Sequence, residues 1–183
     1  MHVRTLLLIL ASLACTACLL PARSVAADGD FSRTTIDLGM VVHDVDKSVA
    51  FYTQAIGFKE LPGFQATGQF TGDAGLTDHQ PVTVRVLVLG DGPTATRLKI
   101  MSLPATAPRQ GDNQFIHSQL GFRYITIGVK DMSSVLARLE KAGVKPLAKC
   151  PLALPKSPSG ESYLTVCHDP DGNFIEFVGP KRK

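Results

Sequence analysis

Residues 36–58 read IDLGMVVHDVDKSVAFYTQAIGF, and residues 122–144 read FRYITIGVKDMSSVLARLEKAGV. Each stretch alternates apolar and polar residues, reaches an aspartate, continues with helical spacing of apolar residues and ends at a glycine. The two aspartates, Asp44 and Asp131, are good helix N-caps, and Gly57 and Gly143 are good helix ends. Such a repeat predicts two copies of one strand–helix unit, which can enclose a cleft for a small molecule.

The first 26 residues have the pattern of a secretory signal peptide. Arg4 precedes a long apolar run, and small residues follow it, which places the cleavage site near Ala26/Ala27. We therefore expect an exported protein, periplasmic or secreted, with no transmembrane span in the mature form. A retained anchor is the alternative, and lipid attachment at Cys15 or Cys18 is also left open.

The charge of the chain argues against a nucleic-acid partner. The formal net charge is +3, and removing residues 1–26 takes away Arg4 and Arg23 but no acidic residue, which leaves +1. A nearly neutral protein whose basic residues are dispersed provides no electrostatic attraction for a phosphate backbone. We expect no nucleic acid among its ligands.

Two cysteines remain in the mature chain, Cys150 and Cys167, and they flank a predicted β-hairpin. Centring its turn on residues 158–159 pairs Leu152 with Thr165 and Cys150 with Cys167. Directly opposed residues of an antiparallel pair can form a disulfide, and an exported protein meets an oxidising compartment. The pattern favours the bond slightly, and two buried free thiols are the alternative because the register can slip by one residue.

The order of elements predicts an α+β fold. Alternating runs at residues 58–64, 82–90 and 96–103 complete the first unit, with a Gly-rich loop or lid at 68–81 between them. Runs at 145–154, 162–169 and 173–180 complete the second unit. The chain therefore reads as two paired β-α-β-β-β modules that form a curled mixed sheet around a cavity, with module one at 33–103, a linker at 104–118 and module two at 119–180.

Two motifs carry a resemblance to a known family. The run DVDKSVAFYTQAIGF (44–58) and the ending DPDGNFIEFVGP (169–180) resemble the hallmarks of the vicinal oxygen chelate superfamily, which includes glyoxalases, bleomycin resistance proteins and extradiol dioxygenases. The resemblance covers residues 33–180. It implies the paired-module fold, but it does not fix a reaction, because one fold serves many chemistries.

In metal-dependent members, four cavity-facing strand positions hold a divalent ion, usually through His and Glu. The resemblance carries these positions onto Asp37, Lys99, Tyr124 and Glu176. Both His ligands are therefore absent, and an ammonium cannot donate a lone pair to a metal. Asp37 and Glu176 are weak metal candidates only, so no cofactor is expected, and Zn, Ni, Mn or Fe is the disfavoured alternative.

Our hypothesis is that Lys99 replaces the cation, between Asp37 and Glu176, with the Tyr124 hydroxyl completing a ligand-binding network. A structural polar cluster in a filled core is the alternative. Arg85 alternates with Val84 and Val86, so it is a further candidate for binding an anionic group in the cavity, with a solvent-facing salt bridge as its alternative.

The resemblance implies a glyoxalase-like or resistance-protein-like small-molecule pocket, and turnover is left open. As an enzyme, the chain would be a lyase or isomerase of a small oxygenated substrate, with Glu176 as the base and Lys99 or Tyr124 stabilising an oxyanion. The alternatives are a sequestering protein without turnover and a degenerate interaction scaffold. A homodimer is consistent with the resemblance but is not encoded in any residue pattern.

Overall fold

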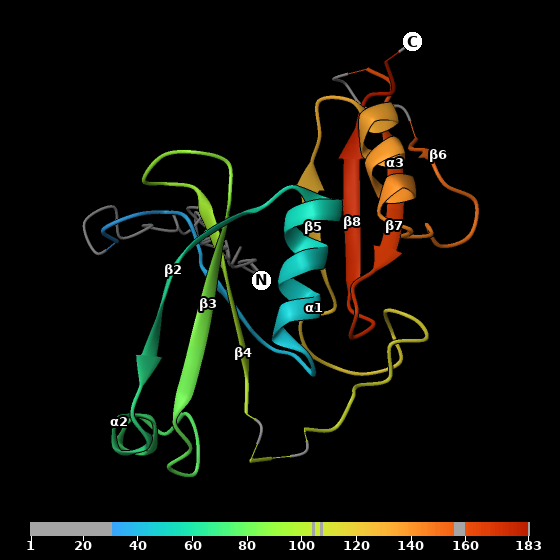
Figure 1. Ribbon diagram of the computed structural model, residues 1–183. Coiled ribbons are helices and arrows are strands. Elements are labelled where there is room, and N and C mark those ends of the chain that lie inside the picture. Colours follow the sequence, from blue (N-terminus) through green and yellow to red (C-terminus); the bar gives the residue numbers. More distant parts are fainter. Residues whose placement is uncertain (1–30, 104, 107, 156–159, 183) are drawn as a thin grey trace, which may run out of the picture. The chain divides into compact units, whose positions relative to one another are not determined.

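The computed structural model describes residues 31–103, 105–106, 108–155 and 160–182 (Figure 1). Residues 33–183 form one unit, to which the following description applies. The predicted signal peptide at 1–26 lies outside the described residues. No helix in the described ranges is long and apolar enough to cross a membrane.

The first half of the unit forms a four-stranded sheet, sheet A, with the order β1-β4-β3-β2. Strands β1 and β4 are parallel, and the other two pairs are antiparallel. A helix and a π-helix connect β1 to β2, and a short helix follows β2 at the tip of the β2–β3 hairpin. The elements are β1 (Leu38–Val41), α1 (Val45–Ala50), η1 (Phe51–Ile56), β2 (Lys59–Ala66), α2 (Gly68–Asp73), β3 (Val82–Leu89) and β4 (Thr96–Ser102).

The second half repeats this plan in sheet B, whose order is β5-β8-β7-β6. Strands β5 and β8 are parallel, and α3 lies across one face of the sheet (Figure 1). The elements are β5 (Tyr124–Gly128), α3 (Met132–Lys141), β6 (Leu152–Ala153), β7 (Tyr163–His168) and β8 (Phe174–Gly179). Two mixed four-stranded sheets with few helices confirm the predicted α+β class and the β-α-β-β-β plan, and the sheets are not closed.

The helix boundaries follow the signals in the sequence. The Asp44 side chain accepts a hydrogen bond from the Lys47 backbone, and the Asp131 side chain accepts bonds from the first turn of α3. Gly57 ends η1 with φ of 103°, a left-handed conformation that favours glycine. One difference concerns residues 68–81, predicted as a loop or lid: a helical turn, α2, forms there because Thr67 caps it.

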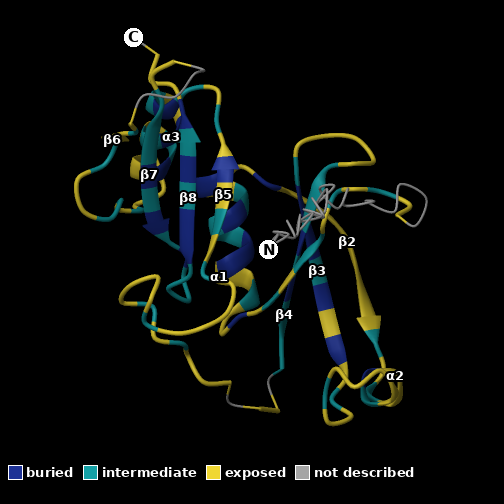
Figure 2. Ribbon diagram, turned by 180° about the vertical axis from the view of Figure 1, so that it is seen from behind, coloured by how far each residue is buried: buried dark blue, intermediate teal, exposed yellow. Residues whose placement is uncertain are grey.

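One hydrophobic core joins the two halves. Tyr52 and Ile56 of η1, Ile100 of β4, Leu139 of α3 and Phe177 of β8 are all at most 3% exposed and belong to the same cluster. The buried residues lie mainly in β3, β4, β7 and β8 and in the helices, whereas most connecting loops are exposed or intermediate (Figure 2). Burial of this shared core, rather than contacts within each module alone, stabilises the unit.

The hairpin that carries the cysteines has a different register from the predicted one. Leu152 pairs with Leu164, not with Thr165, so the two strands are offset by one residue. Cys150 and Cys167 are free thiols, and the Cys150 thiol donates to the Leu147 carbonyl oxygen at 2.8 Å. The sequence pattern could not fix this register because alternating residues fit either pairing.

Candidate functional site

Sheet A has one face turned away from the helices, and we call it the open face. In register, Lys99 of β4 lies between Gly39 of β1 and Val86 of β3, and Met101 lies between Val41 and Val84. These residues alternate with the helix-side core residues Leu98 and Ile100, so they share the opposite face. On that face Val84 and Val86 are themselves buried, at 4% and 6% exposure, whereas Val41 is 45% exposed. Apart from Lys99, these residues of the open face are apolar or glycine.

A β-bulge keeps the β2 side chains on this face. Leu61 pairs with Val86 and Phe64 with Val84, with the irregularity between them at Pro62 and Gly63. A Cβ atom at Gly63 would lie 2.1 Å from the Val84 carbonyl oxygen, so only glycine fits this close approach. The open face consequently presents Phe64, 50% exposed, as part of an apolar surface.

The charged side chains Lys99, Asp37 and Arg33 form a cluster at this face. The Asp37 Oδ2 atom lies 2.7 Å from an Arg33 guanidinium nitrogen and 3.1 Å from Lys99 Nζ. The hydrogen bond from Arg33 and the Lys99 charge lower the pKa of Asp37 to about 2, although burial opposes this shift. Asp37 is therefore ionised at neutral pH. The structure thus brings Lys99 and Asp37 together, and it adds Arg33, which the sequence pattern did not single out.

One oxygen of this cluster has no partner. Asp37 Oδ1 is buried and accepts no hydrogen bond from any described residue. A buried acceptor without a donor costs free energy, about 1–3 kcal/mol, so a donor from outside the chain would be stabilised there. The Lys99 side chain lies beside Asp37 and is 35% exposed. Among the described residues, Asp37 Oδ2 is the one acceptor near its ammonium group.

The equivalent positions of sheet B have a separate arrangement. Thr126 pairs with Glu176 in register, and the Thr126 hydroxyl donates to Glu176 Oε2 at 2.8 Å. Tyr124 begins the strand and is 51% exposed. Within the described ranges, no hydrogen bond or ion pair joins Glu176 or Tyr124 to the Lys99 cluster. The predicted bridge of Lys99 between Asp37 and Glu176 is therefore present on its Asp37 side only.

Arg85 lies on the helix side of sheet A, away from the open face. It pairs with Ile100, a core residue, and its guanidinium forms a bidentate ion pair with Glu60 and a contact of 3.0 Å with Asp46 of α1. These carboxylates raise the pKa of Arg85. The structure thus gives the alternative stated for Arg85, a salt bridge, and not a cavity-facing side chain. Alternation could not decide between the two, because both faces of β3 are apolar.

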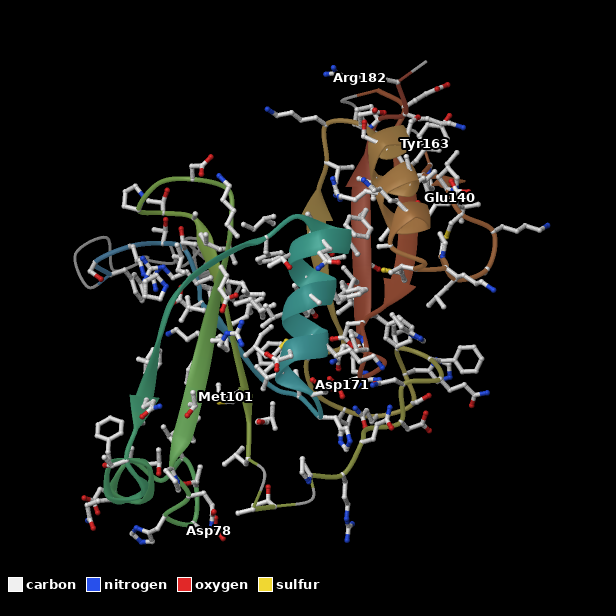
Figure 3. The ribbon with its side chains drawn as sticks, in the orientation of Figure 1. Asp78, Met101, Glu140, Tyr163, Asp171 and Arg182 are labelled. Carbon is white, nitrogen blue, oxygen red and sulfur yellow. The ribbon has the colours of Figure 1, made fainter. Side chains whose placement is uncertain are left out.

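The DPDGN turn between β7 and β8 connects the two halves of the unit. Asp169 Oδ2 accepts a hydrogen bond from the Tyr52 hydroxyl at 2.9 Å, and Asp169 Oδ1 accepts from the backbones of Asp171 and Asn173. Asp171 lies beside the first turn of α1 and accepts from the His43 backbone at 3.1 Å (Figure 3). The motif therefore connects segments distant in sequence through hydrogen bonds, and no local sequence pattern indicates these partners.

The fold and these strand positions can be compared with known proteins. A sequence model described as "Glyoxalase/Bleomycin resistance protein/Dioxygenase superfamily" matches residues 36–177, which is 142 of the 183 residues. The chain belongs to this superfamily. None of the curated proteins compared with it matches.

Several solved structures share this superfamily fold with the chain. A glyoxalase family protein from Bacillus cereus has a TM-score of 0.69 at 18% identity, with 85% of this chain and 99% of that chain covered. A virulence protein from Salmonella typhimurium has a TM-score of 0.50 at 18% identity, covering 81% and 97%. A glyoxalase I mutant from Zea mays has a TM-score of 0.56 at 17% identity, covering 81% and 45%. At these identities the likeness concerns the fold alone.

A divalent metal of the kind that superfamily members typically bind does not fit the residues at these positions. The carboxylate of Asp37 already pairs with two cations, and the Lys99 ammonium repels a metal ion and offers it no lone pair. Within the described residues there is no group of three or more His, Cys, Asp or Glu side chains that could hold a metal. We therefore derive no chemistry through a metal for this chain.

Proposed function

We propose that the chain binds a small organic molecule on the open face of sheet A. Lys99 and Asp37 would hold its polar end, and the exposed apolar side chains of the open face, Val41, Leu61 and Phe64, would cover its body. The observation that carries the proposal is the buried Asp37 Oδ1 without a donor, next to a partly exposed ammonium on an apolar surface. Binding sites of small molecules combine these elements: apolar walls and a few polar groups that orient the ligand.

The charge arrangement supports sequestration without turnover as the leading function. Asp37 holds two cations and is a poor base, because a carboxylate with a lowered pKa has little affinity for a proton. Lys99 can donate to an oxygen of a ligand whether or not a reaction follows. This proposal retains the resistance-protein-like reading of the sequence, and it includes export through the signal peptide predicted at 1–26.

A second candidate function is proton transfer by Glu176. The Thr126 hydroxyl fixes one carboxylate oxygen at 2.8 Å and leaves the other available to a substrate. In this case, a lyase or isomerase of a small oxygenated substrate would use Glu176 as its base. One substitution distinguishes the two candidates: Glu176→Gln should abolish turnover if the protein is an enzyme, whereas a sequestering protein has no turnover to lose.

The binding proposal can be tested with a fluorescent probe that has the two properties of the site. The dye 8-anilinonaphthalene-1-sulfonate combines an apolar ring system with an anionic sulfonate. We expect saturable binding to the folded protein, and we expect Lys99→Met to weaken it about tenfold through loss of a charge-assisted hydrogen bond. Lys130→Met, which removes an exposed ammonium in the β5–α3 turn, is the control and should leave affinity unchanged.

Two results would contradict the proposal. One is dye binding of equal strength to the Lys99→Met and Lys130→Met variants. The other is stronger dye binding under conditions in which the protein no longer unfolds cooperatively. The dye would then report exposed core residues rather than a site of the native protein.

A further inference from the structure

A cavity of the unit lies away from the Lys99 cluster. Its volume is about 470 Å³, and it is formed by three segments: the β1–α1 turn, the 108–119 segment and the DPDGN turn. Neither Lys99 nor Asp37 lines it. A volume of this size is in the range of about 300–1,000 Å³ that small-molecule sites occupy.

Hydrogen bonds hold these walls together without a ligand. Asp171 joins all three segments, because its side chain accepts from the His43 backbone at 3.1 Å, and its carbonyl oxygen accepts from Gln110 at 3.2 Å and Asn113 at 3.4 Å. Within the 108–119 segment, the backbone of Asp112 donates to the Gln119 side chain at 2.9 Å. The cavity is therefore built by the fold rather than left between loose loops.

Arg123, at the start of β5, fixes the long wall in place. Its guanidinium donates to the carbonyl oxygens of Asp112 and Ile116 at 2.9 and 3.1 Å and to the Asn113 side chain at 2.9 Å. A cation that donates to several backbone oxygens acts as a brace for a loop that has no regular secondary structure. Arg123 is thus a positioning residue for the cavity.

The charged side chains that line the cavity form no ion pairs with one another. Lys47 and Arg109 contribute two cations, and Asp44 and Asp171 contribute two carboxylates. In the part of the chain that the structure describes, no ion pair within 4.0 Å involves any of these four side chains. The cavity therefore presents separated positive and negative groups with a net formal charge of zero.

The carboxylates retain capacity for a cationic group. Asp44 uses Oδ1 to cap α1, and its Oδ2 accepts no hydrogen bond from a described residue. Asp171 accepts only a long contact of 3.5 Å from Ser48 at its Oδ2. A ligand ammonium placed near these oxygens, with its carboxylate near Arg109 or Lys47, would satisfy both sets of charges through charge-assisted hydrogen bonds.

We infer that this cavity is a binding site for a small zwitterion, an α-amino acid or a short peptide with free ends. Its amino group is recognised by Asp44 and Asp171, and its carboxylate is recognised by Arg109 and Lys47. Metal binding does not explain the cluster, because the described residues contain no group of three metal-ligating side chains. A simple anion or cation would leave two like charges of the cavity without a counterion.

The test uses calorimetric titration of the purified protein with four probes: alanine, trialanine, N-acetyl-trialanine and trialanine amide. Binding of alanine identifies an amino-acid site, and binding of trialanine alone identifies a peptide site; either result supports the inference. Blocking one end of the bound probe should weaken binding about tenfold, because one charged contact is lost. Equal affinity for free and blocked trialanine would overturn the inference, and so would the absence of heat with all four probes at millimolar concentration.

Matched variants test which residues bind the amino end of the ligand and which bind its carboxylate end. Asp44→Asn keeps the helix cap, since Asn and Asp cap about equally well, but it removes the charge. Asp44→Asn should weaken the affinity for trialanine about tenfold and leave the affinity for N-acetyl-trialanine unchanged. Arg109→Gln should weaken the affinity for every probe with a free carboxylate and leave the affinity for trialanine amide unchanged. Lys141→Gln at the end of α3 is the control. If both cavity variants bind all probes as the control does, the zwitterion site does not exist.

Discussion

The hydrogen bond between Tyr52 and Asp169 connects the two halves of the unit, and Tyr52→Phe removes it while keeping the aromatic ring. Both residues are buried, at 1% and 5% exposure, and the bond is 2.9 Å long. Burial raises the pKa of Tyr52 far above its ordinary value, which keeps the hydroxyl protonated and able to donate. The acceptor is a carboxylate, and hydrogen bonds to charged groups contribute about 1.5–3 kcal/mol.

We expect Tyr52→Phe to lower the free energy of unfolding by about 2 kcal/mol, within the range for such bonds. Asp169 Oδ2 keeps a second donor, the Asn173 side chain at 2.9 Å, which limits the loss. Urea unfolding measures the effect, and for a small protein with an m-value of about 1–3 kcal/mol/M the midpoint falls by about 1 M.

Tyr163→Phe is the matched control. Tyr163 of β7 is half-buried, and its hydroxyl has no side-chain or backbone partner among the described residues. Its removal should change the free energy of unfolding by less than about 0.5 kcal/mol. A loss in Tyr52→Phe no larger than in Tyr163→Phe would refute the argument that this bond holds the two halves together.

Three further predictions concern the charged cluster, the thiols and metal content. Because the pKa of Asp37 is about 2 in the folded protein, its ion pairs contribute their full stability above about pH 4 and lose it as the pH falls towards 2. Between about pH 4 and about pH 2 the urea midpoint should therefore fall more steeply in the unmodified protein than in Asp37→Asn. Burial raises the pKa of Cys167 to about 12, so iodoacetamide at pH 8 should label Cys150 and spare Cys167 until unfolding, as peptide mapping will show. If the intact protein has a mass two hydrogens lower, and neither Cys150 nor Cys167 is labelled before reduction, the two residues form a disulfide. Elemental analysis should find no stoichiometric Zn, Ni, Mn or Fe, and metal that is lost in Glu176→Gln would contradict our assessment of the donor set.

Local signals in the sequence were sufficient to predict the fold. Asp44 and Asp131 cap helices because their short carboxylates reach free backbone N–H groups, and Gly57 ends one because it tolerates positive φ. Each of these effects acts within a few residues. The alternation of the first strand in each module likewise indicated the face that packs in the core, with Leu38 and Met40 in one module and Ile125 and Ile127 in the other.

The site was predictable only in part, because its remaining features depend on contacts distant in sequence. The family resemblance placed Asp37 and Lys99 together, but Arg33 precedes the first strand and carries no motif. The two alternatives for Arg85 stayed open because β3 is apolar on both sides, and the structure shows the salt bridge. The partner of Tyr52 is 117 residues away and cannot be read from any periodicity.

The shared core ties the two sheets together mechanically. Leu38 and Met40 of one half correspond to Ile125 and Ile127 of the other, and all four pack in or against the same cluster. The positions of Lys99 and Glu176 also correspond, but they lie outside this cluster and carry opposite charges. Because both halves fill one close-packed interior, a change of volume at a core-facing position in either half would strain both sheets, whereas a change of charge at Lys99 or Glu176 would stay local.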